Sequence, residues 1–357
     1  MTSEKEKKLK KRSVDESDTL LFCFRLMDEL DQKLLVVFSD GEYRGLLSAG
    51  DIQRAIIKGV SLDSAVKNSA RKNIRVASTN DDEAAVKRLM LDFRTELMPV
   101  VDEEGALVDV IFWNELFEGT VDRAPKINVP VVIMAGGKGT RLKPFSNILP
   151  KPLFPLGEKT ILESIMESFF DSGCNRFLLS LNYKAEFIKN YLSQVETGNY
   201  EVTFFQEEKP LGTAGSLHLV ADKISETFFI SNCDIIIDCD YGEILDYHSS
   251  NKNEITLVAA LKHTKIPYGT VTIGGDGLLK DFSEKPENNY LINTGMYLLE
   301  PHLLDEIPVN EFFHITELID NVKKREGRVG VFPVSEKSWC DIGEWSEYGR
   351  TMKILGV

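Results

Sequence analysis

The stretch VVIMAGGKGTRLKP, which begins at residue 131, limits the possible folds of this chain more than any other segment. Four apolar residues, Val131–Met134, lead through one alanine into glycines at positions 136, 137 and 139. The apolar run predicts a strand buried on both faces, and the glycines predict a loop with backbone conformations unfavourable for other residues. A loop of this kind can turn its N–H groups toward phosphate oxygens. The segment therefore predicts an α/β domain with an anion-binding loop at the end of a buried strand.

Similar apolar runs recur downstream and alternate with segments of helical periodicity. They lie at residues 176–182, 228–237 and 255–261, whereas residues 160–173 have the spacing of an amphipathic helix. Alternating helices and apolar strands favour a mostly parallel sheet with helices on both faces. We therefore expect a large α/β domain over residues 129–357.

Composition excludes several classes of protein. The chain has 357 residues, and its 42 Lys and Arg against 56 Asp and Glu give a formal net charge of −14. This balance disfavours nucleic acid and anionic membranes as partners, because both bind clustered positive charge. No apolar run reaches the roughly 18 residues of a membrane span. The five cysteines are scattered and form no Cys-x-x-Cys pair, which argues against disulfides and structural zinc and points to the cytoplasm.

Residues 1–120 contain a weak internal repeat. One copy spans Leu34–Ile56 and the other Leu97–Phe117. Each reads as two short apolar strands around an acidic-glycine turn, followed by a helix start. Residues 121–128 lose this periodicity and are expected to be a linker. The basic stretch of residues 1–12 is expected to be a solvated terminus.

The repeat resembles a tandem of CBS motifs, a smaller α+β regulatory pair that commonly binds adenine nucleotides. In that family a Ser or Thr and an Asp three residues later hold the ribose, and Ser48 and Asp51 occupy these places in the first copy. The second copy has Phe112 and Glu115 there. The resemblance implies a CBS-pair domain over residues 1–120 that either senses an adenine nucleotide or serves only as a scaffold for dimerisation.

The glycine-rich segment matches neither of two common phosphate-binding patterns. It does not fit G-x-x-x-x-G-K-[ST], and Leu142 replaces the last glycine of the dinucleotide fingerprint, which weakens a nicotinamide dehydrogenase as an alternative. Gly-Gly-x-Gly-Thr-Arg followed by Pro-Lys-Pro instead resembles the signature of sugar-1-phosphate nucleotidyltransferases. The resemblance extends from Val129 to Trp345. It implies a Rossmann-like, mostly parallel nucleotidyltransferase domain over residues 129–357.

The same resemblance implies roles for the loop residues. Arg141 and Lys151 would be catalytic cations that neutralise the triphosphate and the pyrophosphate leaving group. The residues that would line the nucleoside triphosphate are Ala135, Gly136, Gly137, Gly139 and Thr140.

A second segment, FFQEEKPLGTAGS at residues 204–216, resembles the base-reading part of the family. Glu207 falls where uridylyl- and thymidylyl-transferring relatives carry Gln, and Gly212 would let the backbone approach the base. A carboxylate accepts two hydrogen bonds and guanine offers two adjacent donors, whereas uracil has one N–H between two carbonyls. The segment therefore favours GTP. A solvated-loop role for Glu207, and uridylyl or cytidylyl transfer, remain alternatives.

A third segment points to a metal ion. Asp234 follows the apolar strand FFISNC, where a buried carboxylate is costly unless it binds a cation or hydrogen-bond donors. The resemblance pairs it with Asp341 in SWCDIGEW. Two carboxylates with phosphate oxygens suit Mg²⁺, which keeps few protein ligands. Asp234 and Asp341 are therefore predicted to be magnesium ligands and catalytic residues.

Three short segments correspond to the sugar side of the family's site. They are PYGT at residues 267–270, FSEKP at 282–286 and NTGMY at 293–297. The first and third are expected to begin a strand, and the second to end one. The residues that would bind the sugar phosphate are Gly269, Glu284, Lys285 and Asn293. A surface ion pair is the alternative for Glu284 and Lys285.

The resemblance implies transfer of GMP from GTP to a sugar 1-phosphate, with release of pyrophosphate. The CBS-plus-transferase arrangement is similar to a bacterial branch that uses glucosamine 1-phosphate for legionaminic acid and surface glycans; mannose and heptose 1-phosphates are alternatives. A catalytically inactive, CBS-linked regulator is disfavoured because the predicted cations and aspartates are all present. We expect a homodimer or a higher homo-oligomer, since paired CBS modules usually associate.

Overall fold

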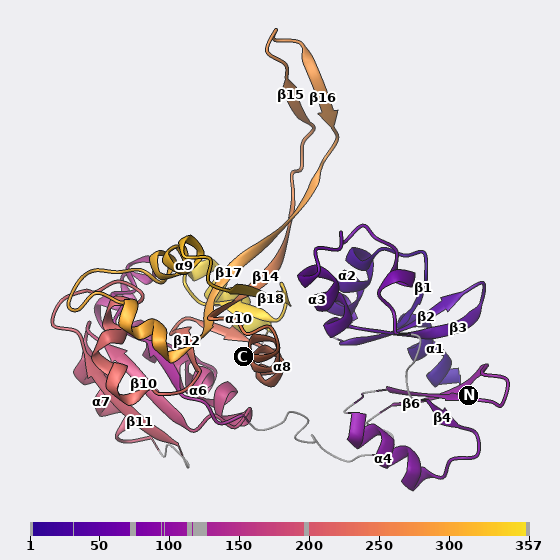
Figure 1. The fold of residues 1–357 in the computed structure, drawn as a ribbon, viewed down its shortest axis with the longest axis horizontal. Coiled ribbons are helices and arrows are strands. Elements are labelled where there is room, and N and C mark those ends of the chain that lie inside the picture. The colour runs from indigo at the N-terminus through magenta and orange to yellow at the C-terminus, as the bar shows by residue number, and fades with distance from the viewer. Residues whose placement is uncertain are drawn as a thin grey trace. The chain divides into compact units, whose positions relative to one another are not determined.

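The computed structural model describes residues 3–30, 32–71, 76–93, 95, 97–112, 116, 127–195 and 200–354. The chain divides into two compact units, Met1–Arg123 and Ala124–Val357. Most of the predicted linker at residues 121–128 lies outside the described residues. Indigo and purple mark the first unit in Figure 1, and the colours from magenta to yellow mark the second.

The first unit repeats one strand–helix–strand–strand arrangement. In each copy the first strand pairs in parallel with the second, which pairs antiparallel with the third. The first copy consists of β1 (Ser13–Asp15), α2 (Leu20–Leu30), β2 (Leu34–Ser39), β3 (Glu42–Ser48) and α3 (Ala49–Ile57), followed by the 3₁₀ helix η1 (Val66–Asn68). The second consists of β4 (Ala77–Ser78), α4 (Glu83–Phe93), β5 (Leu97–Val101) and β6 (Leu107–Phe112). The sequence repeat therefore corresponds to a structural repeat.

The two copies share an apolar core. Val36 and Leu46 of the first pack with Leu97 and Phe112 of the second, and Leu9 of α1 (Ser3–Lys11) joins them. Leu9 is only 7% exposed. The expectation of a solvated N-terminus is therefore wrong, because one apolar side chain anchors an otherwise charged helix.

The second unit is built on a seven-stranded sheet with the order β11-β10-β7-β12-β17-β14-β18. Its strands are β7 (Val131–Met134), β10 (Arg176–Leu181), β11 (Glu201–Gln206), β12 (Phe228–Asn232), β14 (Ile255–Lys265), β17 (Glu287–Leu299) and β18 (Val329–Ser335). Only the two pairs that involve β17 are antiparallel. The mostly parallel α/β sheet predicted from the sequence is confirmed. Two short strand pairs accompany it: β8 (Pro155–Leu156) with β9 (Lys159–Thr160), and β13 (Ile235–Ile237) with β19 (Trp339–Asp341).

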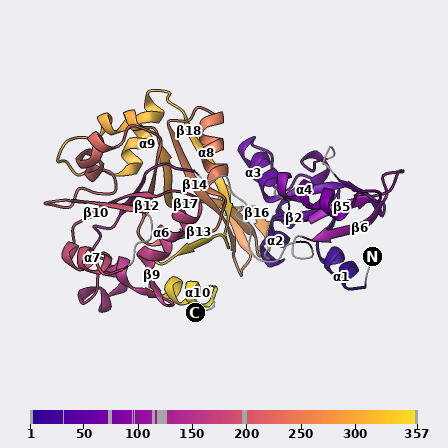
Figure 2. The same ribbon diagram turned by 90° about the horizontal axis from the view of Figure 1, so that it is seen from below.

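Helices cover both faces of this sheet, and Figure 2 shows α9 and α6 on opposite sides of it. The α-helices are α6 (Ile161–Asp171), α7 (Ala185–Leu192), α8 (Tyr241–Ser250), α9 (Ile315–Lys324) and α10 (Trp345–Ile354). The 3₁₀ helices are η2 (Thr140–Leu142), η3 (Phe145–Asn147), η4 (Lys151–Leu153), η5 (Gly215–Lys223) and η6 (Pro301–Glu306). Val131 and Ile133 pack in the core that contains α6, whereas Val132 packs in the core that contains α9. Since successive residues of a strand point to opposite faces, both faces of β7 have to be apolar.

A two-stranded arm extends from this sheet (Figure 1). β14 and β17 pair as far as Lys265 and Glu287, and beyond them β15 (Thr270–Ile273) pairs with β16 (Leu279–Ser283). Asn293 was expected to lie at the start of a strand and instead lies inside β17, because that strand already begins in the arm.

Among the described residues, no helix combines the length and the apolar character that a membrane span requires. None of the five cysteines, all of which are described, forms a disulfide. Burial raises the pKa of the Cys23, Cys174 and Cys233 thiols to about 12, so they stay protonated at neutral pH.

Candidate functional site

The predicted phosphate loop lies at the carboxyl edge of the sheet. β7 lies between β10 and β12, and both run parallel to it, so all three strands end on the same side. The N–H of Ala135 donates to the carbonyl of Ser180 at 2.9 Å, which extends the ladder by one residue. Gly137 and Thr140 then reach the surface. Open α/β sheets bind their ligands at this edge.

Gly139 allows the loop to pack against Lys151. Its φ of 60° lies in the left-handed region, and a Cβ there would lie 3.1 Å from the Cβ of Lys151 and 3.4 Å from that of Ser146. Only a residue without a side chain fits both the conformation and the space. The loop and Lys151, which begins η4, are therefore neighbours.

Lys151 and the two predicted metal ligands form a charge cluster. The ammonium of Lys151 donates to Oδ2 of Asp234, and Lys151 is only 7% exposed. β13 and β19 pair so that Ile235 lies opposite Asp341, and the N–H of Ile342 donates to the carbonyl of Asp234 at 2.8 Å. The fold thus brings two aspartates from distant segments together beside the lysine.

The two carboxylates repel each other. Burial raises the pKa of Asp341, and the charge of Asp234 raises it further. This rise in the pKa of Asp341 is partly offset by the hydrogen bond from the Gly343 N–H and by the positive charges of Lys151 and Arg141. Mg²⁺ commonly uses one or two protein carboxylates together with substrate phosphates, so this donor set fits it. The described part of the chain contains no group of three or more His, Cys, Asp or Glu side chains arranged to hold a metal.

Arg141, the second predicted catalytic cation, lies at the surface. Its guanidinium is 3.3 Å from Oε1 of Glu344, and its side chain is 65% exposed. An exposed ion pair contributes about 0.2–1 kcal/mol, so it holds the arginine weakly. Arg141 can therefore turn toward a phosphate at little cost.

Glu207 is buried, so the alternative of a solvated loop residue is wrong. It is 7% exposed; the Ser180 hydroxyl donates to Oε1 at 2.9 Å, and the Leu211 N–H donates to Oε2 at 3.0 Å. A Cβ on Gly136 would lie 3.2 Å from Oε1, so the carboxylate borders the phosphate loop. Since each carboxylate oxygen has two lone pairs, each has one left after these two hydrogen bonds.

Gly212 is required by backbone packing. Its φ is 82°, and a Cβ there would lie 2.6 Å from the carbonyl oxygen of Phe313. That carbonyl also accepts the N–H groups of Ala214 and Gly215, at 3.1 and 3.0 Å. The predicted base-reading segment is therefore fixed against the chain that leads into α9, and contact of Gly212 with a base stays a prediction.

The four predicted sugar-phosphate residues do not all lie together. A Cβ on Gly269 would be 2.9 Å from Oε2 of Glu284, and Lys285 follows with a φ of 47°. All three belong to the arm, whereas Asn293 lies where β17 joins the main sheet. The strand from Glu287 to Asn293 spans about 20 Å at about 3.3 Å per residue. The continuous β14–β17 ladder therefore separates Gly269, Glu284 and Lys285 from Asn293.

In the first unit, Ser48 and Asp51 form a capping box at the start of α3. The Ser48 N–H and hydroxyl donate to Asp51 Oδ2 at 2.9 and 2.6 Å, and the Asp51 N–H donates back to the hydroxyl. Arg54 and Arg71 both donate to Oδ1 at 2.6 Å. Although burial opposes the charged form, these hydrogen bonds lower the pKa of Asp51. Asp51 is thus held by its own unit, and Glu115 of the second copy lies outside the described residues.

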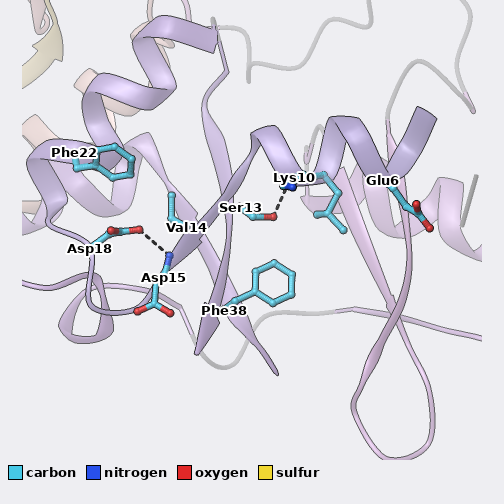
Figure 3. A pocket seen from close by; sticks show the side chains of 9 residues that line it. Glu6, Lys10, Ser13, Val14, Asp15, Asp18, Phe22 and Phe38 are labelled. Atoms are coloured by element: carbon cyan, nitrogen blue, oxygen red, sulfur yellow. Dashed lines mark hydrogen bonds between the residues drawn. The ribbon is translucent and has the colours of Figure 1, made fainter. Parts of the chain in front are cut away.

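A pocket of about 610 Å³ also opens in the first unit (Figure 3). Phe22 and Phe38 supply apolar walls, and Asp18 accepts the N–H of Asp15 at 2.8 Å. Its other lining residues are Glu6, Leu9, Lys10, Ser13 and Val14. The predicted ribose-binding pair at α3 is not among them.

Comparison with protein families agrees with this geometry. Residues 130–355 match the family model described as nucleotidyl transferase, and residues 10–58 match that of the CBS domain. The chain belongs to the nucleotidyl transferase family. The first match contains the glycine loop, Lys151 and both aspartates, and the second contains the first copy of the repeat.

Relatives of this nucleotidyl transferase include guanylyltransferases. The mannose-1-phosphate guanylyltransferase catalytic subunit beta of Drosophila melanogaster is 31% identical over 223 residues, 61% of this chain and 60% of that protein. Mannose-1-phosphate guanylyltransferase 1 of Arabidopsis thaliana is 32% identical over 231 residues, 62% of this chain and 63% of that protein. The chain spans half to about three-fifths of the length of the curated relatives it matches.

Among solved structures, HddC from Yersinia pseudotuberculosis is 29% identical with a TM-score of 0.51, covering 64% of this chain and 99% of that chain. Its complex with GMP-PN is 28% identical with a TM-score of 0.50 and the same coverage. Both likenesses extend over nearly the whole of HddC.

Some polar residues support the site of this nucleotidyl transferase without belonging to a recognised motif. The hydroxyl of Ser180 is fully buried between Glu207 and Ser216, 3.0 Å from the Ser216 hydroxyl. A Cβ on Gly295 would lie 2.4 Å from Nδ2 of Asn232, so the Asn232 side chain, at the end of β12, packs closely against β17. A serine or asparagine inside or ending an apolar run, as in RFLLSL and FFISN, is the signal that could have revealed them.

Proposed function

We propose that the chain transfers GMP from GTP to a sugar 1-phosphate and releases pyrophosphate. The observation that carries this proposal is the cluster of Lys151, Asp234 and Asp341 beside a glycine loop at the carboxyl edge of the sheet. A phosphate-binding loop, a cation and metal-binding carboxylates are the groups that nucleotidyl transfer uses. The buried carboxylate of Glu207 and the guanylyltransferase names of the relatives support guanine as the base.

The proposed reaction needs no covalent protein intermediate. A sugar-phosphate oxygen forms a bond to the α-phosphorus of GTP while the bond to the bridging β-phosphate oxygen breaks, and pyrophosphate leaves with that electron pair. The loop N–H groups hold phosphate oxygens and orient the α-phosphorus for attack. Lys151 and Arg141 neutralise the charge that develops on the leaving group.

The cofactor is proposed to be Mg²⁺. Members of the nucleotidyl transferase family generally use a divalent metal ion. Held by Asp234 and Asp341, it would supply positive charge to the phosphates. In the structure Lys151 donates to Asp234, so this lysine changes its partner from a carboxylate to a phosphate when the substrate binds.

Glucosamine 1-phosphate is the proposed sugar substrate, for legionaminic acid or surface-glycan synthesis, because a CBS domain precedes the transferase. Mannose 1-phosphate is the second candidate, because the curated relatives are named for it. The two sugars differ at C2, where one has an amino group and the other an axial hydroxyl. A direct comparison of their kcat/KM values therefore separates the candidates.

A pyrophosphate-release assay that crosses four nucleoside triphosphates with a panel of sugar 1-phosphates tests the proposal. We expect the highest kcat/KM with GTP and no release when the sugar phosphate is omitted. Asp238→Asn is a matched control for Asp234→Asn, since Asp238 is exposed nearby and should tolerate the change. A higher kcat/KM with UTP or CTP would refute the assignment of the base, and no release with any pair would refute the transferase.

For the first unit we propose an adenine nucleotide as regulator, bound near Ser48 and Asp51. Binding there requires the ribose to compete with Arg54 and Arg71 for Asp51. Calorimetric titration of the full chain with ATP and AMP tests this, with Asp51→Asn as the comparison. An absence of binding to the unaltered chain would leave the scaffold role.

A further inference from the structure

The arm, residues 266–286, has an apolar face that the described part of its own unit leaves uncovered. Val271 pairs with Phe282 and Ile273 with Leu279, and residues that pair directly across two strands point to the same face. These four side chains are 57–65% exposed. The opposite face is polar and includes Thr272. The arm is therefore an amphipathic ribbon whose apolar side faces solvent.

A ribbon of this kind needs a partner. Two strands alone are at best marginally stable in water. Tyr268 and Leu278, 74% and 68% exposed, enlarge the apolar surface. With about 150–250 Å² for an aromatic side chain and roughly 150 Å² for an aliphatic one, the exposed surface of the six residues is on the order of 600 Å², at the upper limit for monomers. A standard interface takes about 800 Å² from each partner, so this face can form the centre of one.

The arm also carries predicted substrate residues away from its own sheet. Glu284 and Lys285 precede β17 and lie at least about 20 Å along the ribbon from Asn293. The β14–β17 ladder is continuous over this distance. Folding the arm back onto its own sheet would break several backbone hydrogen bonds, each with a net contribution of about 1 kcal/mol.

We propose that two copies of the chain exchange their arms, so that Glu284 and Lys285 of each copy complete the sugar-phosphate site of the other. A two-fold symmetric pair buries both apolar faces and carries Lys285 to the other copy's sheet edge. Such an interface is self-complementary, because the same surface serves both copies. The roles of Glu284 and Lys285 rest on the proposed function, whereas the interface rests on the arm alone.

Complementation between two inactive variants tests the exchange. Lys285→Ala removes the cation of the arm, and Asp234→Asn removes a carboxylate of the sheet edge. The two chains are co-expressed with different affinity tags and purified through both tags. With exchanged arms, the mixed dimer has one site with both defects and one intact site. We expect about half of the wild-type pyrophosphate release, against about 1% or less for each variant alone.

The mixed dimer of Asp234→Asn with Asp341→Asn is the matched control. Both defects lie at the sheet edge, so neither site is intact and activity stays at the level of the single variants. If the mixed dimer of Lys285→Ala with Asp234→Asn is equally inactive, each arm acts on its own chain and the exchange is refuted.

Oligomeric state separates failure of the exchange from failure of the proposed function. Light scattering of the full chain should give twice the protomer mass of 40.2 kDa. Ile273→Lys, on the apolar face, should weaken dimerisation at least tenfold, whereas Thr272→Lys, on the polar face, should not. Leu279→Ser provides a second variant of the apolar face, and a thermal melt confirms that each variant is folded.

Two results of the oligomeric-state measurements would oppose the exchange of arms. A monomeric wild type, or equal dimerisation of the Ile273→Lys and Thr272→Lys variants, would overturn it even for an active transferase. An inactive chain whose dimer depends on Ile273 would instead refute the proposed function and support the arm interface.

Discussion

Replacing Glu207 by Gln separates recognition of the base from support of the loop. In the structure Oε2 accepts the Leu211 N–H and Oε1 accepts the Ser180 hydroxyl. A glutamine can keep both contacts: its carbonyl oxygen accepts from Leu211, and its amide donates to Ser180, whose proton then points to Ser216. We therefore expect the free energy of unfolding to fall by less than about 1 kcal/mol.

The same variant should lose its preference for guanine. Glutamine places an N–H donor where the carboxylate offered an acceptor to the two donors of guanine. A hydrogen bond to a charged group contributes about 1.5–3 kcal/mol, which corresponds to roughly a 10- to 150-fold loss in kcat/KM for GTP. Uracil presents acceptors on either side of its N–H, so kcat/KM for UTP should stay constant or rise.

Pyrophosphate release with GTP and with UTP, at one fixed sugar 1-phosphate, measures this ratio. Thermal unfolding of the same samples measures stability. Glu208→Gln is the matched control, because Glu208 is the exposed neighbour of Glu207 and carries the same charge. If the Glu207→Gln enzyme keeps its GTP-to-UTP ratio of kcat/KM within about twofold of wild type, the carboxylate does not read the base.

Three further changes test other parts of the structure. Asp234→Asn should lower turnover about 10²- to 10³-fold and should also lower the melting temperature, because it leaves the buried Lys151 without its carboxylate partner; near-normal turnover with Mg²⁺ would contradict the metal assignment. Gly212→Ala should destabilise the fold by about 1–3 kcal/mol in urea unfolding, because the new Cβ would meet the Phe313 carbonyl and φ is 82°. The hydrogen bond from Arg325 lowers the pKa of Glu254 to about 2, so its contribution to stability is present above the unfolded pKa and is lost as pH falls toward 2. Glu254→Gln should therefore be less stable than wild type at pH 6 and converge with it in unfolding measured down to pH 2, whereas a constant difference would exclude this ion pair as the cause.

The strand and glycine loop at residues 131–139 could be predicted because their constraints are local. A strand with both faces buried has to be apolar over Val131–Met134, and the left-handed conformation at Gly139 excludes most other residues. Both signals are contained within one short segment. The mostly parallel sheet follows from the same logic, repeated along the chain.

The N-terminal helix, the burial of Glu207 and the placement of the arm could not be predicted, because they depend on contacts between distant segments. The helix at residues 3–11 is anchored by Leu9, and the part of the core that buries it includes Phe112, about a hundred residues away. Burial of Glu207 depends on Ser180, which the pairing of β10 with β11 places beneath it. The alternation in the arm predicts strands but does not say what covers them, so the separation of Lys285 from Asn293 is visible only in three dimensions.

The acidic charge of the chain implies different roles for the two predicted catalytic cations. Both have carboxylate partners in the structure, Arg141 with Glu344 and Lys151 with Asp234. Breaking the exposed pair costs at most about 1 kcal/mol, so Arg141 can meet an incoming triphosphate first. Withdrawing Lys151 would leave Asp234 uncompensated in a largely buried pair, which costs on the order of 3–5 kcal/mol. With a net charge of −14 the protein has no excess of cations to offset this loss. We therefore expect Lys151 to reach the phosphates only when another positive charge stands at Asp234, which makes a divalent cation a requirement for tight nucleotide binding as well as for catalysis.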